Sequence, residues 1–308
     1  MMCPGAPGAP ASIPMDMMDH YTLERWRELE RMQQEDARAR EEEADLNAET
    51  AYLRVRLADS YMRNGKVSRA IAEYKRAIKL DRRNGLFHTR LADAYVAAED
   101  IPTAMNTYRK AIEIDPALAD PHSSLGDLYL RYGMLWHALE QYREAVRLEA
   151  DRAFYHYQLG NTMEQMGQYD DALYHLTRAA ELSPNLAFYR FRLATLYQHH
   201  GDVDRAYLHM DAVCRLAPFD DYYLVRTASL AIATGHTDAA IILLQRALAL
   251  RPQNDAYQYL LAKACLVAGD RDQHNLLRRR VGRLGQYDEE FVTRRLAEWC
   301  VPVPGEVE

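Results

Sequence analysis

The sequence has few cysteines and no long apolar stretch. The first argues against a cysteine-based zinc or redox site, and the second against a membrane-spanning protein. Its 308 residues include four cysteines, none with the short paired spacing of a zinc site or a redox motif. No segment approaches the roughly 18 apolar residues of a membrane span, and residues 1–14 lack the basic start and apolar run of a secretory signal. We therefore expect a protein without a membrane span that works in the reducing cytoplasm, with structural thiols at Cys3, Cys214, Cys265 and Cys300.

Positive charge is not in excess either. The chain carries 38 Lys plus Arg against 45 Asp plus Glu, for a formal net charge of -7. The whole imbalance lies in residues 16–50, which hold 12 acidic and 5 basic side chains. Because binding to nucleic acid needs clustered Lys and Arg that displace counterions from phosphates, this balance argues against a nucleic-acid partner.

Motifs of catalysis and of cofactor binding are missing as well. The sequence contains no HExxH pair, no glycine-rich phosphate loop, no nucleophile elbow and no Cys-His spacing of a known site. Among its 11 histidines, His199 and His200 precede Gly201, where polar side chains at the end of a helix are ordinary. We therefore predict no catalytic residues, no cofactor and no bound metal, and we expect that the protein is not an enzyme.

What the sequence does have is a pattern with a period of 34 residues. Each period contains a Leu followed by Ala or Gly. Most periods then have a glycine near the end of a predicted helix. An alanine follows, at a place where two helices can approach closely. The second period has Glu99 and Asp100 in place of the glycine. Tyr or another apolar residue follows the alanine, and Pro closes several periods. The alanines mark the period most plainly, at Ala70, Ala104, Ala138, Ala172, Ala206 and Ala240.

These residues resemble the signature of the tetratricopeptide repeat family. The resemblance implies an all-α fold, a right-handed superhelical solenoid of antiparallel helix pairs in which neighbouring repeats bury one another's apolar faces. A further repeat, the seventh, at residues 255–288 is degenerate, because His274 and Arg278 stand where the family has Ala and an apolar residue, which casts doubt on its second helix. Repeats one to six are assigned to residues 51–84, 85–118, 119–152, 153–186, 187–220 and 221–254.

The two ends of the chain differ from the repeats. Residues 1–15 are expected to be disordered, and residues 16–50 to form a charged helix with a short apolar stripe. A solvated extension, docking on the first repeat and pairing with a second chain all fit this helix, although no sustained heptad predicts a coiled coil. Residues 289–308 are expected to form a capping helix and a short tail, because the last repeat needs a lid. The apolar residues behind these predictions are Met18, Trp26, Leu29 and Met32 at one end, and Phe291, Val292, Leu296 and Trp299 at the other.

The resemblance also implies where a ligand would bind. In this family the first helices of successive repeats line a concave groove. The positions of each repeat that face this groove fall into two zones of this sequence. The polar zone, in repeats one to three, holds Arg–Asp pairs that equally suit local ion pairing. The aromatic zone, in repeats four to six, has the composition of an interface hot spot, although rings at these places also fill gaps between repeats. The predicted groove residues are Arg56, Asp59, Arg90, Asp93 and Asp127 in the polar zone, and Phe154, Tyr157, Asn161, Phe188, Phe191, Arg192, Tyr222 and Arg226 in the aromatic zone.

We therefore predict a non-catalytic adaptor or scaffold that binds an extended peptide or a helix of a partner protein in this groove. The subclass of the family that clamps the C-terminal carboxylate of chaperones does not fit, because Tyr157 and Tyr222 stand where two of its lysines would be. A self-assembling scaffold that uses the terminal helices is the alternative. The expected state is a monomer or a weak homo-oligomer, and the identity of the partner cannot be deduced from a groove.

Overall fold

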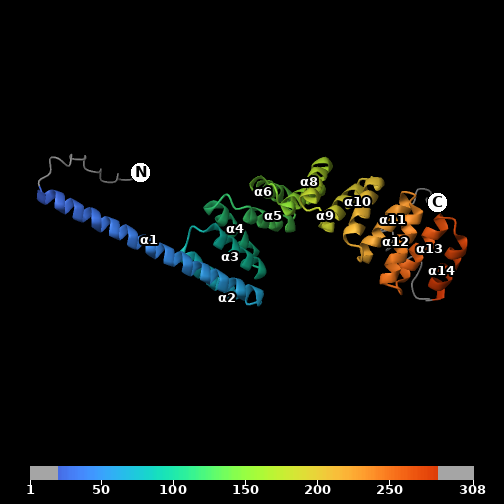
Figure 1. Cartoon of the computed structure of the whole chain (residues 1–308), viewed down its shortest axis with the longest axis horizontal. Helices are drawn as coiled ribbons and strands as arrows, with labels where there is room; N and C mark the ends of the chain where they lie inside the picture. The colour runs from blue at the N-terminus through green and yellow to red at the C-terminus, as the bar shows by residue number, and fades with distance from the viewer. Residues whose placement is uncertain (1–19, 284–308) are drawn as a thin grey trace. The chain divides into compact units, whose positions relative to one another are not determined.

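The computed structural model describes residues 20–283, and α-helices dominate that range (Figure 1). It contains 14 helices joined by short turns, and no β-strand between residues 20 and 283. The prediction of an all-α fold is therefore confirmed. The predicted disordered segment 1–15 and the predicted capping helix in residues 289–308 lie outside the described residues. None of the described helices combines the length and the apolar content that crossing a membrane requires.

The chain divides into two compact units, and the N-terminal unit comprises residues 1–116. Its helices are α1 (His20–Arg63), α2 (Val67–Leu80), α3 (Gly85–Ala97) and α4 (Ile101–Ile114). Within this unit, α1 packs against α2, α2 against α3, and α3 against α4. Ala51, Ala58 and Tyr74 are buried where α1 meets α2, and Phe87 of α3 belongs to the same apolar core.

The C-terminal unit comprises residues 117–308 and continues the same arrangement. Its described helices again pack in sequence, each against its neighbour in the chain. A large apolar core cluster, which includes Leu224, Leu244 and Leu261, joins its last helices. The helices are α5 (Ala119–Arg131), α6 (Leu135–Leu148), α7 (Ala153–Gln165), α8 (Tyr169–Leu182), α9 (Ala187–His199), α10 (Val203–Leu216), α11 (Asp221–Ala233), α12 (Thr237–Leu250), α13 (Asp255–Val267) and α14 (Arg271–Arg283).

Small residues let the two helices of a repeat lie close together. A Cβ atom added to Gly126 of α5 would come within 2.7 Å of the Tyr142 ring on α6. At Gly160 of α7, an added Cβ would lie 3.0 Å from Leu176 of α8. Glycine in the Leu-Gly pairs of repeats three and four therefore allows the close approach of the helices seen there. The periodic alanines serve the same purpose and are completely buried, at Ala70, Ala104, Ala138, Ala172, Ala206 and Ala240.

The turn inside each repeat passes through a residue with positive φ. Gly133 has φ of 71°, and the backbone N–H of the following residue, Met134, donates to the carbonyl oxygen of Tyr129 at 2.9 Å. This is the hydrogen bond that closes a helix through a left-handed residue, which glycine adopts without steric cost. Repeat two makes the same turn with Glu99 at φ of 61°, the one non-glycine residue of positive φ in the described chain.

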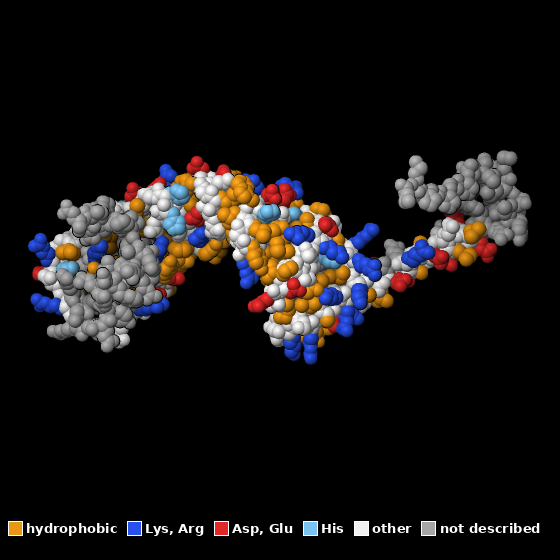
Figure 2. Space-filling view, turned by 180° about the vertical axis from the view of Figure 1, so that it is seen from behind, with side chains coloured by type: hydrophobic (Ala, Val, Ile, Leu, Met, Phe, Trp, Pro, Cys, Tyr) orange, Lys and Arg blue, Asp and Glu red, His pale blue; other side chains and the backbone are white. Residues whose placement is uncertain are grey.

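Two helices differ from the sequence-based expectations. The charged helix predicted for residues 16–50 and the first helix of repeat one form one continuous helix, α1, of 44 residues. The side chains of residues 28–40 are all exposed on it, and Figure 2 shows acidic and basic groups along it. In repeat seven the doubted second helix is present as α14. It forms without the expected Ala because His274 Nδ1 lies 2.8 Å from the carbonyl oxygen of Ala262 and Leu277 is buried.

Candidate binding surface

The exposed rings of the aromatic zone lie on the first helices of repeats four, five and six. Phe154 on α7, Phe188 on α9 and Tyr222 on α11 occupy equivalent places and are 43%, 38% and 40% exposed. Tyr157 and Phe191 are half-buried on α7 and α9. The first helices α7, α9 and α11 thus each present one large ring to solvent.

The rings also contact one another from repeat to repeat. The ring centroids of Tyr157 on α7 and Phe188 on α9 are 5.0 Å apart, with the planes at 72°. The centroids of Phe191 on α9 and Tyr222 on α11 are 5.9 Å apart, with the planes at 65°. Both contacts have the edge-to-face geometry that aromatic quadrupoles favour. The exposed rings of Phe188 and Tyr222 are therefore each held by a half-buried one. In the aromatic zone, Tyr157 and Phe191 fill gaps between repeats, and Phe188 and Tyr222 face solvent.

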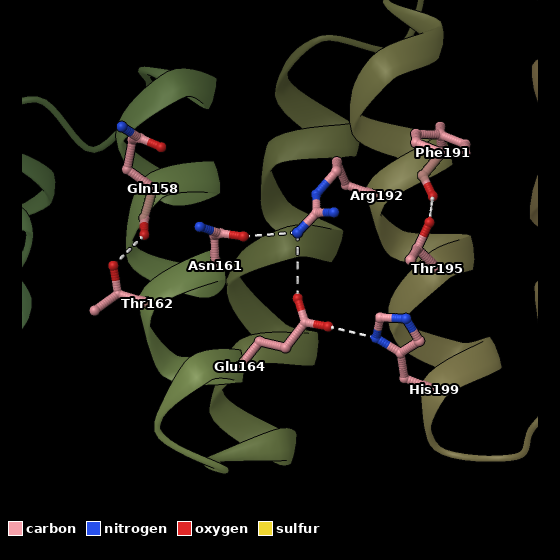
Figure 3. A network of polar contacts seen from close by, with 8 residues as sticks. All are labelled: Gln158, Asn161, Thr162, Glu164, Phe191, Arg192, Thr195 and His199. Carbon is pink, nitrogen blue, oxygen red and sulfur yellow. Dashed lines mark hydrogen bonds and ion pairs between the residues drawn. The ribbon is translucent and has the colours of Figure 1, made fainter. Parts of the chain in front are cut away.

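A polar network connects α7 with α9 beside these rings (Figure 3). Arg192 Nη2 donates to Asn161 Oδ1 at 2.6 Å and lies 3.3 Å from Glu164 Oε2. The other carboxylate oxygen of Glu164 lies 3.0 Å from His199 Nδ1. The Arg192 guanidinium also stands over the ring of Tyr157, with 5.9 Å between its Cζ atom and the ring centroid. Because the Arg192 and Glu164 side chains are only 22% and 15% exposed, solvent screens this ion pair less than a surface pair.

The same position makes the same kind of bond in neighbouring repeats. Arg226 of α11, one period after Arg192, donates from Nη2 to Gln198 Oε1 of α9 at 2.8 Å. Gln158 of α7, one period before Arg192, donates from Nε2 to Asp127 of α5. A ladder of polar side chains therefore links α5, α7, α9 and α11.

The sequence analysis did not select Glu164, Gln198 or His199, which take part in this ladder. A signal for two of them exists in the sequence. Glu164 precedes Arg192 by 28 residues, and Gln198 precedes Arg226 by 28 residues. An acceptor at a constant offset before each arginine therefore indicates an inter-repeat contact, provided that the period is known.

Carboxylates of the polar zone accept hydrogen bonds within their own repeats. Tyr74 on α2 donates its hydroxyl hydrogen to Asp59 Oδ1 on α1 at 2.5 Å. Burial above all, and then the bond to Asp59, raise the pKa of the Tyr74 hydroxyl, so it stays protonated and remains a donor. Arg56 and Arg90 are exposed on the first helices of repeats one and two. The three equivalent pairs are Tyr74 with Asp59, Tyr108 with Asp93, and Tyr142 with Asp127.

These pairs change together from repeat to repeat. In repeat four, Leu176 takes the place of the tyrosine and Asn161 takes the place of the aspartate. Repeat five has Met210 and Thr195 at these two places. A carboxylate therefore stands at this position of repeats one to five only where a buried hydroxyl reaches it. Where the hydroxyl is absent, as in repeat four, Asn161 accepts from Arg192 of the next repeat instead.

Comparison with known families agrees with this architecture. The family described as TPR repeat matches residues 58–98 and 92–133, and the family described as tetratricopeptide repeat matches residues 153–186 and 225–272. Together these matches take in about half of the chain. The chain belongs to the tetratricopeptide repeat family. Proteins of this family generally mediate protein–protein interactions, and the family is usually non-catalytic.

Solved structures of other tetratricopeptide repeat proteins are similar in fold. YrrB, described as a TPR protein with an unusual peptide-binding site, is 22% identical over 59% of this chain and 93% of its own, with a TM-score of 0.50. A tetratricopeptide repeat protein from Parabacteroides merdae is 16% identical over 81% of this chain and 98% of its own, with a TM-score of 0.53. Pseudomonas aeruginosa pilF is 21% identical over 70% of this chain and 97% of its own, with a TM-score of 0.52. A search of curated proteins found no match. At these identities the likeness concerns the fold.

Proposed function

We propose that this tetratricopeptide repeat protein is a non-catalytic adaptor that holds an extended or helical segment of a partner protein on α7, α9 and α11. The observation that carries the proposal is the row of partly exposed rings at Phe154, Phe188 and Tyr222. Large rings bury much apolar area while losing little conformational entropy, which is why they are common at interface hot spots. YrrB, a structural neighbour, is described as having a peptide-binding site, and this supports the choice of ligand class.

The support around the rings strengthens the proposal. Tyr157 and Phe191 pack edge-to-face against the exposed rings of Phe188 and Tyr222, and Arg192 is bonded to α7. A surface held in place before binding loses less conformational freedom when the ligand arrives, so more of the contact energy appears as affinity. Arg226 engages one nitrogen with Gln198, and its guanidinium carries further N–H donors for a peptide carbonyl or carboxylate.

The polar zone has a smaller part in the proposed binding. Asp59, Asp93 and Asp127 each accept a hydrogen bond from a tyrosine of the second helix, so part of their capacity is already used. Arg56 and Arg90 are exposed and contribute charge that selects among partners rather than most of the affinity.

The proposed setting is the reducing cytoplasm. Cys214 and Cys265 are buried free thiols, and burial raises the pKa of both. The Cys214 Sγ atom lies 3.0 Å from the Thr227 hydroxyl oxygen, inside the core. Protonated, buried thiols are unreactive, which supports a structural role for these two cysteines.

A pull-down with matched variants tests the proposal. The triple variant Phe188→Ala, Phe191→Ala and Tyr222→Ala removes two of the three exposed rings and the half-buried ring that supports Tyr222. The control Tyr174→Ala removes a ring that is 65% exposed on the second helix α8. Partners captured by the wild-type chain and identified by mass spectrometry should be lost with the triple variant and kept with the control. Far-ultraviolet circular dichroism should show equal helix content in all three proteins. Undiminished capture by the triple variant would reject the surface.

A further inference from the structure

Helix α1 exposes leucines at positions that are buried in later repeats. Leu53 and Leu57 are 58% and 44% exposed. One period later, Phe87 and Leu91 are 0% and 7% exposed. The difference arises because α2 packs against α3 and covers these places, whereas among the described residues no helix lies over this face of α1.

The uncovered face forms a shallow depression. It has a volume of about 600 Å³ and is lined by Leu53, Arg56, Leu57, Asp59 and Arg63. Apolar surface of this kind at the end of a repeat stack is the place where another repeat would add its second helix. The natural occupant is therefore a helix.

The apolar stripe extends beyond the depression along α1. Leu46 is 65% exposed, and Thr50 lies between it and Leu53. The spacing of 46, 50, 53 and 57 alternates four and three residues, which puts all four on one side of a helix that pairs with another helix. The opposite side, with Ala51 and Val55, is already buried in the core formed with α2. This stripe is too short for a sustained coiled coil, but it suits a local helix pair.

The distribution of charge along α1 favours one orientation for a second copy of α1 packed on this stripe. Residues 41–49 contain five acidic side chains and no basic one. Residues 54–63 contain three arginines and one aspartate, and of these arginines Arg54 is paired with Glu73 of α2, which leaves Arg56 and Arg63 for a second copy. Two copies of α1 in parallel would place like charges side by side. Two antiparallel copies would bring the acidic segment of each against the arginines of the other, which is the favourable arrangement.

The apolar residues just before α1 cannot reach the stripe, because the chain that joins them to α1 is too short. Leu46 lies 26 residues beyond His20, which is about 39 Å along a helix that rises 1.5 Å per residue. Ile13 is seven residues before His20, and seven residues span at most about 25 Å when fully extended. The Met residues at 15, 17 and 18 are closer still to His20, so their reach is shorter.

We propose that two copies of this chain pair through α1, antiparallel and related by a two-fold axis. In this register Leu46 of one copy packs against Leu57 of the other, and Leu53 packs against Thr50. Glu49, which is exposed, then lies beside the exposed Arg56 of the second copy, and the two-fold axis repeats every contact. The proposal does not depend on the rings on α7, α9 and α11, and in the dimer Arg56 faces the second copy instead of a groove ligand.

Sedimentation equilibrium of the full chain tests the pairing. The wild-type chain should approach a mass of about twice 35.5 kDa at high concentration. The double variant Leu53→Glu and Leu57→Glu should raise the dissociation constant at least about a hundredfold, because each lost contact occurs twice in the dimer. The control Leu208→Glu changes a leucine that is 65% exposed on α10, and it should leave the dimer intact. A monomeric wild-type chain, or a dimer indifferent to the double variant, would overturn the proposal.

Charge reversal tests the register. Glu49→Arg alone and Arg56→Glu alone each create two like-charge contacts and should each weaken the dimer. Mixing equal amounts of the two variants should restore it, since the introduced arginine then faces the introduced glutamate, and the native Arg56 of one variant faces the native Glu49 of the other. This rescue requires contact between copies, so a fold defect in either variant cannot imitate it. Failure of the mixture to dimerise better than its components would exclude this antiparallel register.

Discussion

Tyr142 of α6 donates its hydroxyl hydrogen to the carboxylate of Asp127 on α5, across the interior of repeat three. The bond ties the second helix of the repeat to the surface of the first. Equivalent bonds in repeats one and two join Tyr74 to Asp59 and Tyr108 to Asp93. These three carboxylates are therefore part of the packing of their own repeats.

Removing the tyrosine hydroxyl should destabilise the N-terminal unit. Tyr74→Phe leaves Asp59 without this donor and should lower the free energy of unfolding by about 1–2 kcal/mol. Urea denaturation followed by circular dichroism measures the change. A double-mutant cycle with Asp59→Ala isolates the pair, and a coupling energy near zero would contradict the role assigned to the bond.

Replacing Glu99 by glycine should stabilise the protein. Glu99 adopts φ of 61° in a turn where the other repeats of the described chain have glycine. A side chain in the left-handed region costs about 1–2 kcal/mol, part of which is offset by the greater freedom of glycine in the unfolded chain. Glu99→Gly should therefore raise the free energy of unfolding by roughly 1 kcal/mol in a urea titration. The reverse change, Gly133→Glu, should lower the free energy of unfolding. If both variants were as stable as the wild type, a side chain at positive φ would not be strained in this turn.

Loss of Arg192 should cost more stability than loss of a surface arginine. Arg192→Ala removes the bond to Asn161 and leaves Glu164, whose side chain is 15% exposed, without its cation. We expect a loss of about 2 kcal/mol, and Arg192→Lys should not restore it because a lysine lacks the planar fork of donors. The control Arg178→Ala breaks a solvent-exposed pair with Glu181 and should cost less than about 1 kcal/mol. Equal effects at the two positions would argue against the inter-repeat network.

The protein should lose stability in mild acid through a histidine pair. His156 and His175 face each other with 2.9 Å between their Nδ1 atoms, and His156 Nε2 lies 3.1 Å from the carbonyl oxygen of Ala150. This geometry suits two neutral rings, in which His156 Nε2 donates to Ala150 and His175 Nδ1 donates to His156. Burial, together with the neighbouring His156, lowers the pKa of His175 to about 4.

The sign of the pH effect follows from that shift. Between about pH 6.5 and pH 4 the unfolded chain binds a proton at His175 that the folded chain does not bind, so the free energy of unfolding falls as the pH drops. The contribution is fully present above about pH 6.5. Urea titrations at several pH values should show a shallower fall for His175→Gln than for the wild type. An identical slope in both proteins would contradict the neutral pair.

Local sequence patterns were enough to predict the helices and their pairing. The period of 34 residues placed Ala70 and its equivalents at helix contacts, and each of them is fully buried. The structure added detail at two places. The sequence left open how the charged segment 16–50 joins repeat one, and α1 continues unbroken through Arg63. At α14, His274 replaced the expected Ala but found a backbone acceptor at Ala262.

The sequence by itself determined that this protein is built from repeated helix pairs, because helix formation and contact with the nearest neighbour depend on residues close in the chain. Only the tertiary structure decided which partner each polar side chain takes. Asp59 meets Tyr74 from the same repeat, whereas Asn161 meets Arg192 from the next one. It also decided that Leu53 is exposed while Phe87 is buried at the same place in the period. These outcomes depend on whether another helix lies alongside and on the atoms it presents, which the pattern within one repeat does not contain.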